Sequence, residues 1–325
     1  MYNAELKEEF VKQFTDSITT RNACLTLFNK FEPYEVMWNA DLCTQEAEVL
    51  TPIINNLIGL RVRSKNNRMS ILVNYGQWCL DNNVSGACNG LLNVKPDNLE
   101  NVRHQTVKNP KHLQRYLNEI CLPESMQSAD NTIRCFYWLA YAGMNEDDIF
   151  SVKTTDVNLD EMEVVYNGES YNIYREGLDA IKNCVKLNQF VYINPNYSAD
   201  KIVYIDRVPG DILIRGIKGT LSKQTMRVVL SRKSKECLKP DKITGKPKTD
   251  LKLSYYRVWL SGVFYRMYEN ELAGDKPDFK SLADSTSANK EYKLSSGRNT
   301  QESKRRKLAH EFATDYQRWK MTLSK

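Results

Sequence analysis

The hydrophobic period of the chain changes near residue 157, and this change constrains the fold more than any other feature. Before it, apolar residues recur at helical spacing, as in NTIRCFYWLAYAG. The segment VNLDEMEVVYNGESYNIYR then carries two strand-length runs on either side of Asn167-Gly168, a dipeptide typical of two-residue hairpin turns. The sequence therefore predicts a mainly α fold with a small β-sheet.

The first hundred residues read as helices, with no convincing strand. One helix is predicted over residues 2–30, a second over 44–60, and a third within 61–82, where the basic segment RVRSKNNR leads into an apolar face. The opening TQEAE of the second helix places acids in a first turn, where they favour the helix dipole.

The segment 94–110, VKPDNLENVRHQTVKNP, is polar and has prolines near both ends, which is typical of an interdomain linker. We therefore predict a helical N-terminal domain over residues 1–100 and a second domain over 101–325. In the second domain the patterns predict two core helices, then the hairpin, then further strands in FVYINP and KIVYIDRVPGDILIRG. A basic helix is predicted in LSKQTMRVVLSRK, followed by an amphipathic helix whose apolar face holds Leu260, Val263, Phe264 and Met267. The chain is predicted to end in a loop-like tail over 283–306 and a short closing helix.

Positive charge is concentrated in two segments. The net charge is only +6, yet residues 215–257 hold thirteen Lys and Arg against three acids. Residues 61–80 hold four bases and no acid, whereas residues 1–60 hold four bases and nine acids. Charge gathered in this way predicts two surfaces that face a polyanion, and the alternative is a pair of solvated basic loops.

The eight cysteines form no CxxC pair, and the three histidines are scattered, so zinc-ligand spacing is absent. We expect reduced thiols packed as small hydrophobes, with no metal and no cofactor. The mean hydropathy of −0.56, the short apolar stretch over 135–144 and the polar N-terminus predict a cytoplasmic protein without a signal peptide or membrane span.

Two motifs give the chain a family resemblance. LAYAGMNEDDIFSVKTTDVNLDE, residues 139–161, is similar to the first catalytic box of the tyrosine recombinases, or phage integrases, and the hairpin follows it in the expected order. LSYYRVWL, residues 253–260, resembles the second box, His-x-x-Arg at the start of a long helix. The resemblance implies a helical core-binding domain followed by an α+β domain of the catalytic type.

The same resemblance implies that most of the catalytic chemistry is missing. The family's first Arg, which braces the scissile phosphate, is replaced by Asn145, and the His of the second box is replaced by Ser254. The hairpin holds no Lys, and no His or Trp follows at the expected distance, although the second Arg survives as Arg257. Tyr292 lies near the nucleophile spacing and Tyr316 is a second candidate. We therefore expect no enzymatic activity and no catalytic residue.

A recombinase fold without its chemistry but with basic surfaces is best interpreted as a sequence-specific binder of double-stranded DNA. The chain resembles, more narrowly, the lysogeny-maintaining master repressors of SP-beta-type phages, which implies transcriptional repression through operator elements on DNA in the bacterial cytoplasm, where the protein could oligomerise. The residues predicted to contact DNA are Arg61, Arg63, Lys65, Asn67, Arg68, Lys153, Lys223, Arg227, Lys246, Lys248, Lys252, Tyr255 and Arg257.

Three alternatives stay open at the level of sequence. The chain could be an active integrase, an accessory protein that helps an active recombinase to assemble, or a scaffold that never meets DNA. Internal pairing of Arg257 with an acid such as Asp148 is the alternative to a phosphate contact at that position.

Overall fold

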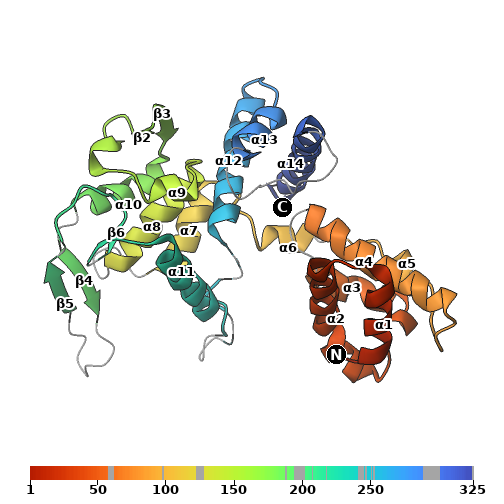
Figure 1. The fold of residues 1–325 in the computed structure, drawn as a ribbon. Coiled ribbons are helices and arrows are strands. Elements are labelled where there is room, and N and C mark those ends of the chain that lie inside the picture. Colours follow the sequence, from red (N-terminus) through yellow and green to blue (C-terminus); the bar gives the residue numbers. More distant parts are fainter. Residues whose placement is uncertain are drawn as a thin grey trace. The chain divides into compact units, whose positions relative to one another are not determined.

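In a computed structural model the chain divides into two compact units, residues 1–102 with 282–318 and residues 103–281 with 319–325 (Figure 1). The structure describes residues 1–57, 62–96, 99–121, 128–186, 189–193, 202–206, 208–216, 218–240, 245, 247–249, 251, 253–287 and 301–323.

Helices and one 3-10 turn are the regular elements of the first unit's described residues. Its elements are α1 (Ala4–Phe14), α2 (Ile18–Trp38), the 3-10 turn η1 (Leu42–Thr44), α3 (Ala47–Leu57), α4 (Val62–Asp81), α5 (Gly90–Asn93) and most of α13 (Phe279–Ser287) and α14 (Gln301–Leu323), while α6 (Leu99–Arg103) ends at the boundary.

The predicted helix over residues 2–30 is wrong, because the chain breaks between α1 and α2. Thr15 adopts an extended conformation, and the hydroxyl of Ser17 accepts a hydrogen bond from the backbone N–H of Thr20, which caps a new helix. The second predicted helix also begins later than expected, at Ala47, because residues 42–44 form a separate 3-10 turn. The third is confirmed as α4.

An aromatic core with an ionic cluster at its edge holds the N-terminal helices together. Phe10 of α1 packs edge-on against Phe28 of α2 and Tyr75 of α4, and all three rings are buried. The Lys7 ammonium is fully buried and lies 2.5 Å from a Glu35 carboxylate oxygen and 3.3 Å from Asp41. This cluster fixes α1 against the end of α2.

The second unit combines helices with three small antiparallel sheets. In chain order it holds α7 (Pro110–Ile120), α8 (Ser128–Tyr141), α9 (Glu146–Ile149), η2 (Thr154–Asp156), β1 (Val157–Asn158), β2 (Glu163–Tyr166), β3 (Glu169–Asn172), α10 (Arg175–Lys186), β4 (Gln189–Ile193), β5 (Ile202–Asp206), β6 (Arg215–Gly216), β7 (Gly219–Thr220), α11 (Lys223–Cys237) and α12 (Tyr255–Leu272).

The hairpin predicted from the sequence is confirmed. Strands β2 and β3 pair in antiparallel register from Glu163↔Asn172 to Tyr166↔Glu169, and β1 completes the order β1-β2-β3. Asn167 and Gly168 both adopt positive φ, 51° and 80°, as a two-residue hairpin turn requires. The two further strand predictions are confirmed as the pair β4-β5.

Helix α8 is the centre of the second unit. Every residue from 130 to 142 is buried, and α10 and α12 pack against it. The contact with α12 is close at Gly262, where an added Cβ would lie 1.9 Å from the carbonyl oxygen of Tyr141. Only glycine permits this approach of the two helix backbones.

Three local predictions need correction. The amphipathic face predicted for α12 is shifted: Val258, Trp259 and Phe264 are buried, whereas Leu260 is only half-buried. The tail over 283–306 is not simply a loop, because α13 continues to Ser287 and α14 begins at Gln301.

The predicted linker contains α6, and the end of the linker is anchored to the second unit. The Val107 N–H donates to the Ser261 hydroxyl at 3.0 Å, and the Val107 carbonyl accepts from the Trp319 indole at 2.9 Å.

Within the described residues, no helix combines the length and the apolar composition needed to cross a membrane. The same residues hold no group of three or more His, Cys, Asp and Glu side chains with the arrangement of a metal site. The eight cysteines are free thiols, and all but Cys88 are buried.

Candidate nucleic-acid interface

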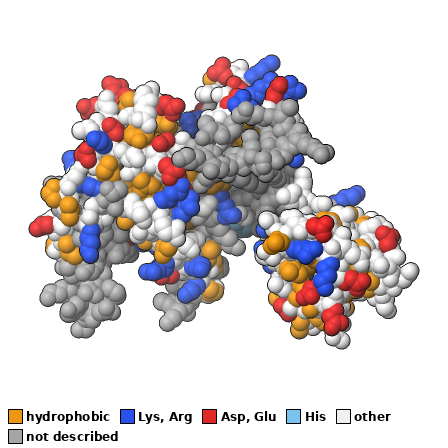
Figure 2. Space-filling model, viewed as in Figure 1, with side chains coloured by type: hydrophobic (Ala, Val, Ile, Leu, Met, Phe, Trp, Pro, Cys, Tyr) orange, Lys and Arg blue, Asp and Glu red, His pale blue; other side chains and the backbone are white. Residues whose placement is uncertain are grey.

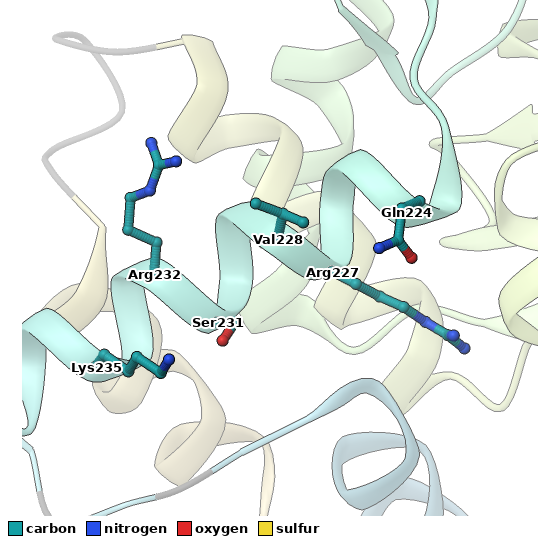
Figure 3. A pocket seen from close by; sticks show the side chains of 6 residues that line it. All are labelled: Gln224, Arg227, Val228, Ser231, Arg232 and Lys235. Carbon is teal, nitrogen blue, oxygen red and sulfur yellow. The ribbon is translucent and has the colours of Figure 1, made fainter.

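Helix α11 separates its residues into a buried face and an exposed face. The helix begins where the Ser222 hydroxyl accepts from the Thr225 N–H at 3.1 Å, and it buries Met226, Leu230 and Cys237. On the other side, side chains at i, i+3, i+4, i+7, i+8 and i+11 project into solvent from successive turns (Figure 3). These residues line a shallow, open depression: Gln224, Arg227, Val228, Ser231, Arg232 and Lys235.

The exposed face carries the side-chain types that read base edges in a DNA groove. An amide such as that of Gln224 matches adenine, a guanidinium such as that of Arg227 matches guanine, and an apolar group such as Val228 matches the thymine methyl. Hydroxyl and ammonium groups complete the set with partners for phosphate or base. Figure 2 shows Lys and Arg side chains gathered over α11, while Asp and Glu side chains gather over the β2–β3 hairpin of the same unit.

Not every cation of α11 faces outward. The Lys233 ammonium lies 2.5 Å from the carboxylate of Asp130, which has no exposed surface, and it also donates to the carbonyl of Ile120 at 3.3 Å. This pair anchors α11 to the start of α8. Within the described part of the chain, neither Arg232 nor Lys235 has a carboxylate at ion-pair distance. Those two cations are available to an anionic ligand.

The structure brings the two motif segments together. The Tyr255 hydroxyl donates to the carbonyl of Met144 at 2.8 Å, and the Trp259 indole donates to the carbonyl of Gly143 at 3.0 Å. The first turns of α12 thus hold the loop that precedes α9. Asn145 stands at the N-cap of α9, and its amide donates to the Asp148 carboxylate at 3.2 Å.

Arg257 lies in the first turn of α12, where its backbone N–H donates to the carbonyl of Ser254 at 3.1 Å. Its side chain is half-buried, and this burial lowers the pKa of the guanidinium from its ordinary value. The Ser254 side chain caps no backbone group of α12.

Other predicted residues are more dispersed. Asn67 of α4 is exposed, whereas the Lys65 ammonium donates to the carbonyl of Pro96 at 3.2 Å and the Arg68 guanidinium donates to the carbonyl of Leu57. Arg68 therefore closes the end of α3. Arg61, Lys246 and Lys252 lie outside the described residues, as does the side chain of Arg63.

Two predicted residues of the second unit do not line the depression on α11. Lys153 is exposed and pairs with Asp211 at 2.9 Å, and the hydrogen bond from Lys153 lowers the pKa of that carboxyl. Lys248 is exposed, and its backbone N–H donates to the carbonyl of Cys237 at the end of α11.

The two nucleophile candidates are Tyr316 and Tyr292. Tyr316 has no exposed surface, so its hydroxyl is closed to a phosphodiester in this conformation. Tyr292 lies outside the described residues.

The sequence prediction named Lys223 and Arg227 on α11 but missed five of their neighbours. A signal for these was present, because polar residues recur at helical spacing opposite Met226 and Leu230. The missed residues are Gln224, Val228, Ser231, Arg232 and Lys235.

The first unit begins with a helical domain, and the second is mainly helical with small sheets, which is the architecture predicted from the motifs. Residues 1–81 match the family model described as MrpR, N-terminal core-binding domain. Residues 1–81 are therefore similar to the core-binding domain of MrpR, and for this segment the resemblance predicted from the sequence is confirmed.

The chain was also compared with curated proteins and with solved structures. A comparison with curated proteins finds no match. Among solved structures the chain is similar to one described as the crystal structure of XerA recombinase, with 13% identity, a TM-score of 0.37, and coverage of 85% of this chain and 86% of that one.

Proposed function

We propose that this protein is a sequence-specific double-stranded DNA-binding protein that represses transcription and maintains phage lysogeny from an inactive recombinase scaffold. The observation that carries the proposal is the exposed face of α11, where Arg232 and Lys235 stand beside an amide, a hydroxyl and an apolar side chain. The MrpR-type core-binding domain supports the same function. The repressor role follows from the sequence resemblance to the master repressors of SP-beta-type phages.

The absence of catalysis is part of the proposal. A neutral amide at Asn145 cannot form the charged fork that stabilises a pentavalent phosphate, and Ser254 cannot move protons as an imidazole does. Purified protein should form no covalent adduct with a nicked suicide duplex that contains its binding site. A denaturation-resistant adduct that disappears in Tyr292→Phe would show an active recombinase, the alternative function that the retained Arg257 favours.

Further contacts with the DNA backbone are proposed for described residues outside the α11 face. Arg257 is the strongest of them, because the N-terminal turn of α12 holds it and adds backbone donors for an anion. The others are Asn67, Lys153, Lys248 and Tyr255. Lys65 and Arg68, which the sequence also predicted to contact DNA, donate to backbone carbonyls of the protein, so the proposal leaves them out.

The direct test is selection of bound duplexes from a pool with randomised centres, followed by mapping of bound sites in the host genome. The proposal expects one enriched motif, a steep fall of affinity with salt, and increased transcription of genes beside the mapped sites when the protein is depleted. Binding that enriches no motif, or no binding at low salt, would overturn it. Bound sites confined to a recombination locus, with unchanged transcripts, would instead indicate an accessory recombination factor.

A further inference from the structure

The carboxylate of Glu146 sits directly beside the first turn of α11. Glu146 is the first residue of α9, and its side chain is only 5% exposed. Its Oε1 accepts from the Arg227 Nε at 3.0 Å, and its Oε2 accepts from a terminal nitrogen of the same guanidinium. The Lys223 ammonium lies 3.1 Å from the same Oε2 and 3.1 Å from Asp147 Oδ1.

This arrangement is a two-pronged ion pair that fixes the direction of Arg227. A planar guanidinium and a planar carboxylate joined by two parallel bonds define an orientation as well as an energy. The Arg227 side chain remains 49% exposed, so the fixed group still lies at the surface that carries Gln224 and Val228. The pair uses two of the five N–H donors of a guanidinium.

The same carboxylate lowers the net positive charge at this end of α11, where a DNA phosphate would bind. Glu146 and Asp147 together carry two negative charges opposite the two positive charges of Lys223 and Arg227. Non-specific DNA affinity comes from cations that neutralise phosphates. A phosphate that approaches this end of α11 therefore competes with a carboxylate already bound in the geometry that the phosphate would use.

We propose that Glu146 is a specificity-determining positioning residue of the DNA-binding surface, which holds Arg227 toward base edges and lowers its affinity for phosphates of arbitrary sequence. This inference rests on the proposed function, because it concerns the α11 face. It adds a distinction between the two ends of α11. At the Lys223–Arg227 end the guanidinium is oriented toward base edges, and at the Arg232–Lys235 end the cations attract DNA phosphates of any sequence.

The test compares Glu146→Gln with the unchanged protein on two duplexes, the most enriched duplex from the selection and a scrambled duplex of the same composition. The variant should bind the scrambled duplex about threefold to tenfold more tightly, with a salt slope steeper by about one. The ratio of the two affinities should fall by at least the same factor. Asp160→Asn, an exposed carboxylate on the β1–β2 turn, makes the same change of net charge and should leave the ratio unchanged.

Two more variants separate positioning from stability. Glu146→Asp keeps the charge, so it should keep the scrambled-duplex affinity low even if the shorter side chain loosens the fit. In an Arg227→Ala background, Glu146→Gln should change the affinity ratio little, because the group that it positions is gone. Equal falls of both affinities with a lower melting temperature, or an unchanged ratio, would overturn the inference.

The failure of the inference and the failure of the proposed function give different results. If the unchanged protein binds no DNA at low salt or enriches no motif, the proposed function fails. If Arg232→Ala with Lys235→Ala leaves DNA binding intact, the α11 face is not the interface. If that pair weakens binding while Glu146→Gln leaves the affinity ratio unchanged, only the role of Glu146 is wrong.

Discussion

In the N-terminal helices Lys7 and Arg68 bind groups of the protein itself, whereas α11 divides its cations between the protein and the solvent. Lys7 is buried against Glu35 and Asp41, and Arg68 binds the end of α3. On α11, Lys233 is anchored to Asp130, while Arg232 and Lys235 project from the opposite face. Both regions are helical, so the contrast comes from which side of the helix each cation occupies.

The difference shows that a run of positive charge in a sequence does not define a DNA surface. The segment 61–80 carries four bases and no acid, yet two of those bases donate to backbone carbonyls. Such a cation completes the hydrogen bonding of a helix end and loses freedom to reach a phosphate. Substitutions of the bound cations in the N-terminal helices should therefore lower stability, whereas substitutions of the exposed cations of α11 should lower DNA affinity.

The largest effect is expected in the N-terminal helices. Lys7→Met leaves the Glu35 and Asp41 carboxylates buried without their ammonium, and it should lower the free energy of unfolding of this region by about 3–5 kcal/mol. Hydrogen exchange of the amides of α1 and α2 in increasing urea measures the change. Lys12→Met, on the exposed face of α1, is the matched control and should be nearly neutral. A neutral Lys7→Met would break the comparison.

On α11 the reverse pattern is expected. Arg232→Ala with Lys235→Ala should reduce the slope of log affinity against log salt by about two, because two phosphate-type contacts are lost. Arg232→Ala alone should reduce this slope by about one and weaken binding to the selected and scrambled duplexes alike. The melting temperature should stay within about a degree, since both side chains are exposed. Fluorescence anisotropy across a salt series, with thermal unfolding beside it, checks both statements.

Arg68 sharpens the comparison, because sequence and structure give it different roles. Arg68→Ala removes the hydrogen bond to the Leu57 carbonyl and should cost about 1 kcal/mol of stability. Asn67→Ala, one residue earlier and exposed, should leave stability unchanged. If Arg68→Ala instead weakens DNA binding at constant stability, the start of α4 belongs with α11 as a DNA surface.

Local patterns predicted much of the fold, and their failures have physical causes. The hairpin followed from Asn167-Gly168, whose positive φ angles are set by the turn itself. The break at Thr15–Ser17 was missed because these polar residues also fit the solvent face of a continuous helix, and only the cap formed by Ser17 decides between the two.

The candidate site was predictable only where neighbours in space are neighbours in sequence. The residues of the exposed face of α11 recur at helical spacing within one segment, so the sequence alone indicates that they share a face. The bond between Arg227 and Glu146 joins residues 81 positions apart, and no local pattern indicates which acid a given cation meets. The same limit concealed the Lys7–Glu35 pair, which is separated by 28 positions.

The smallest effect concerns pH, and it again separates the two regions. Burial raises the pKa of the Glu35 carboxyl above its ordinary value of 4.5, against the opposing hydrogen bond from Lys7. As pH rises through 4.5, the unfolded chain therefore loses this proton before the folded chain does. The free energy of unfolding of α1 and α2 should fall from pH 4.5 up to the raised pKa of Glu35 and then level off.

Glu35→Gln removes the titrating group, so this decline should vanish, although the weaker bond to Lys7 lowers stability at every pH. Glu8→Gln, an exposed carboxylate on α1, should keep the decline and serves as the control. Hydrogen exchange at a series of pH values, corrected for the intrinsic exchange rate, resolves α1 and α2 from α11. A decline of equal size in α11, which holds no part of this cluster, would show that the pH dependence arises elsewhere.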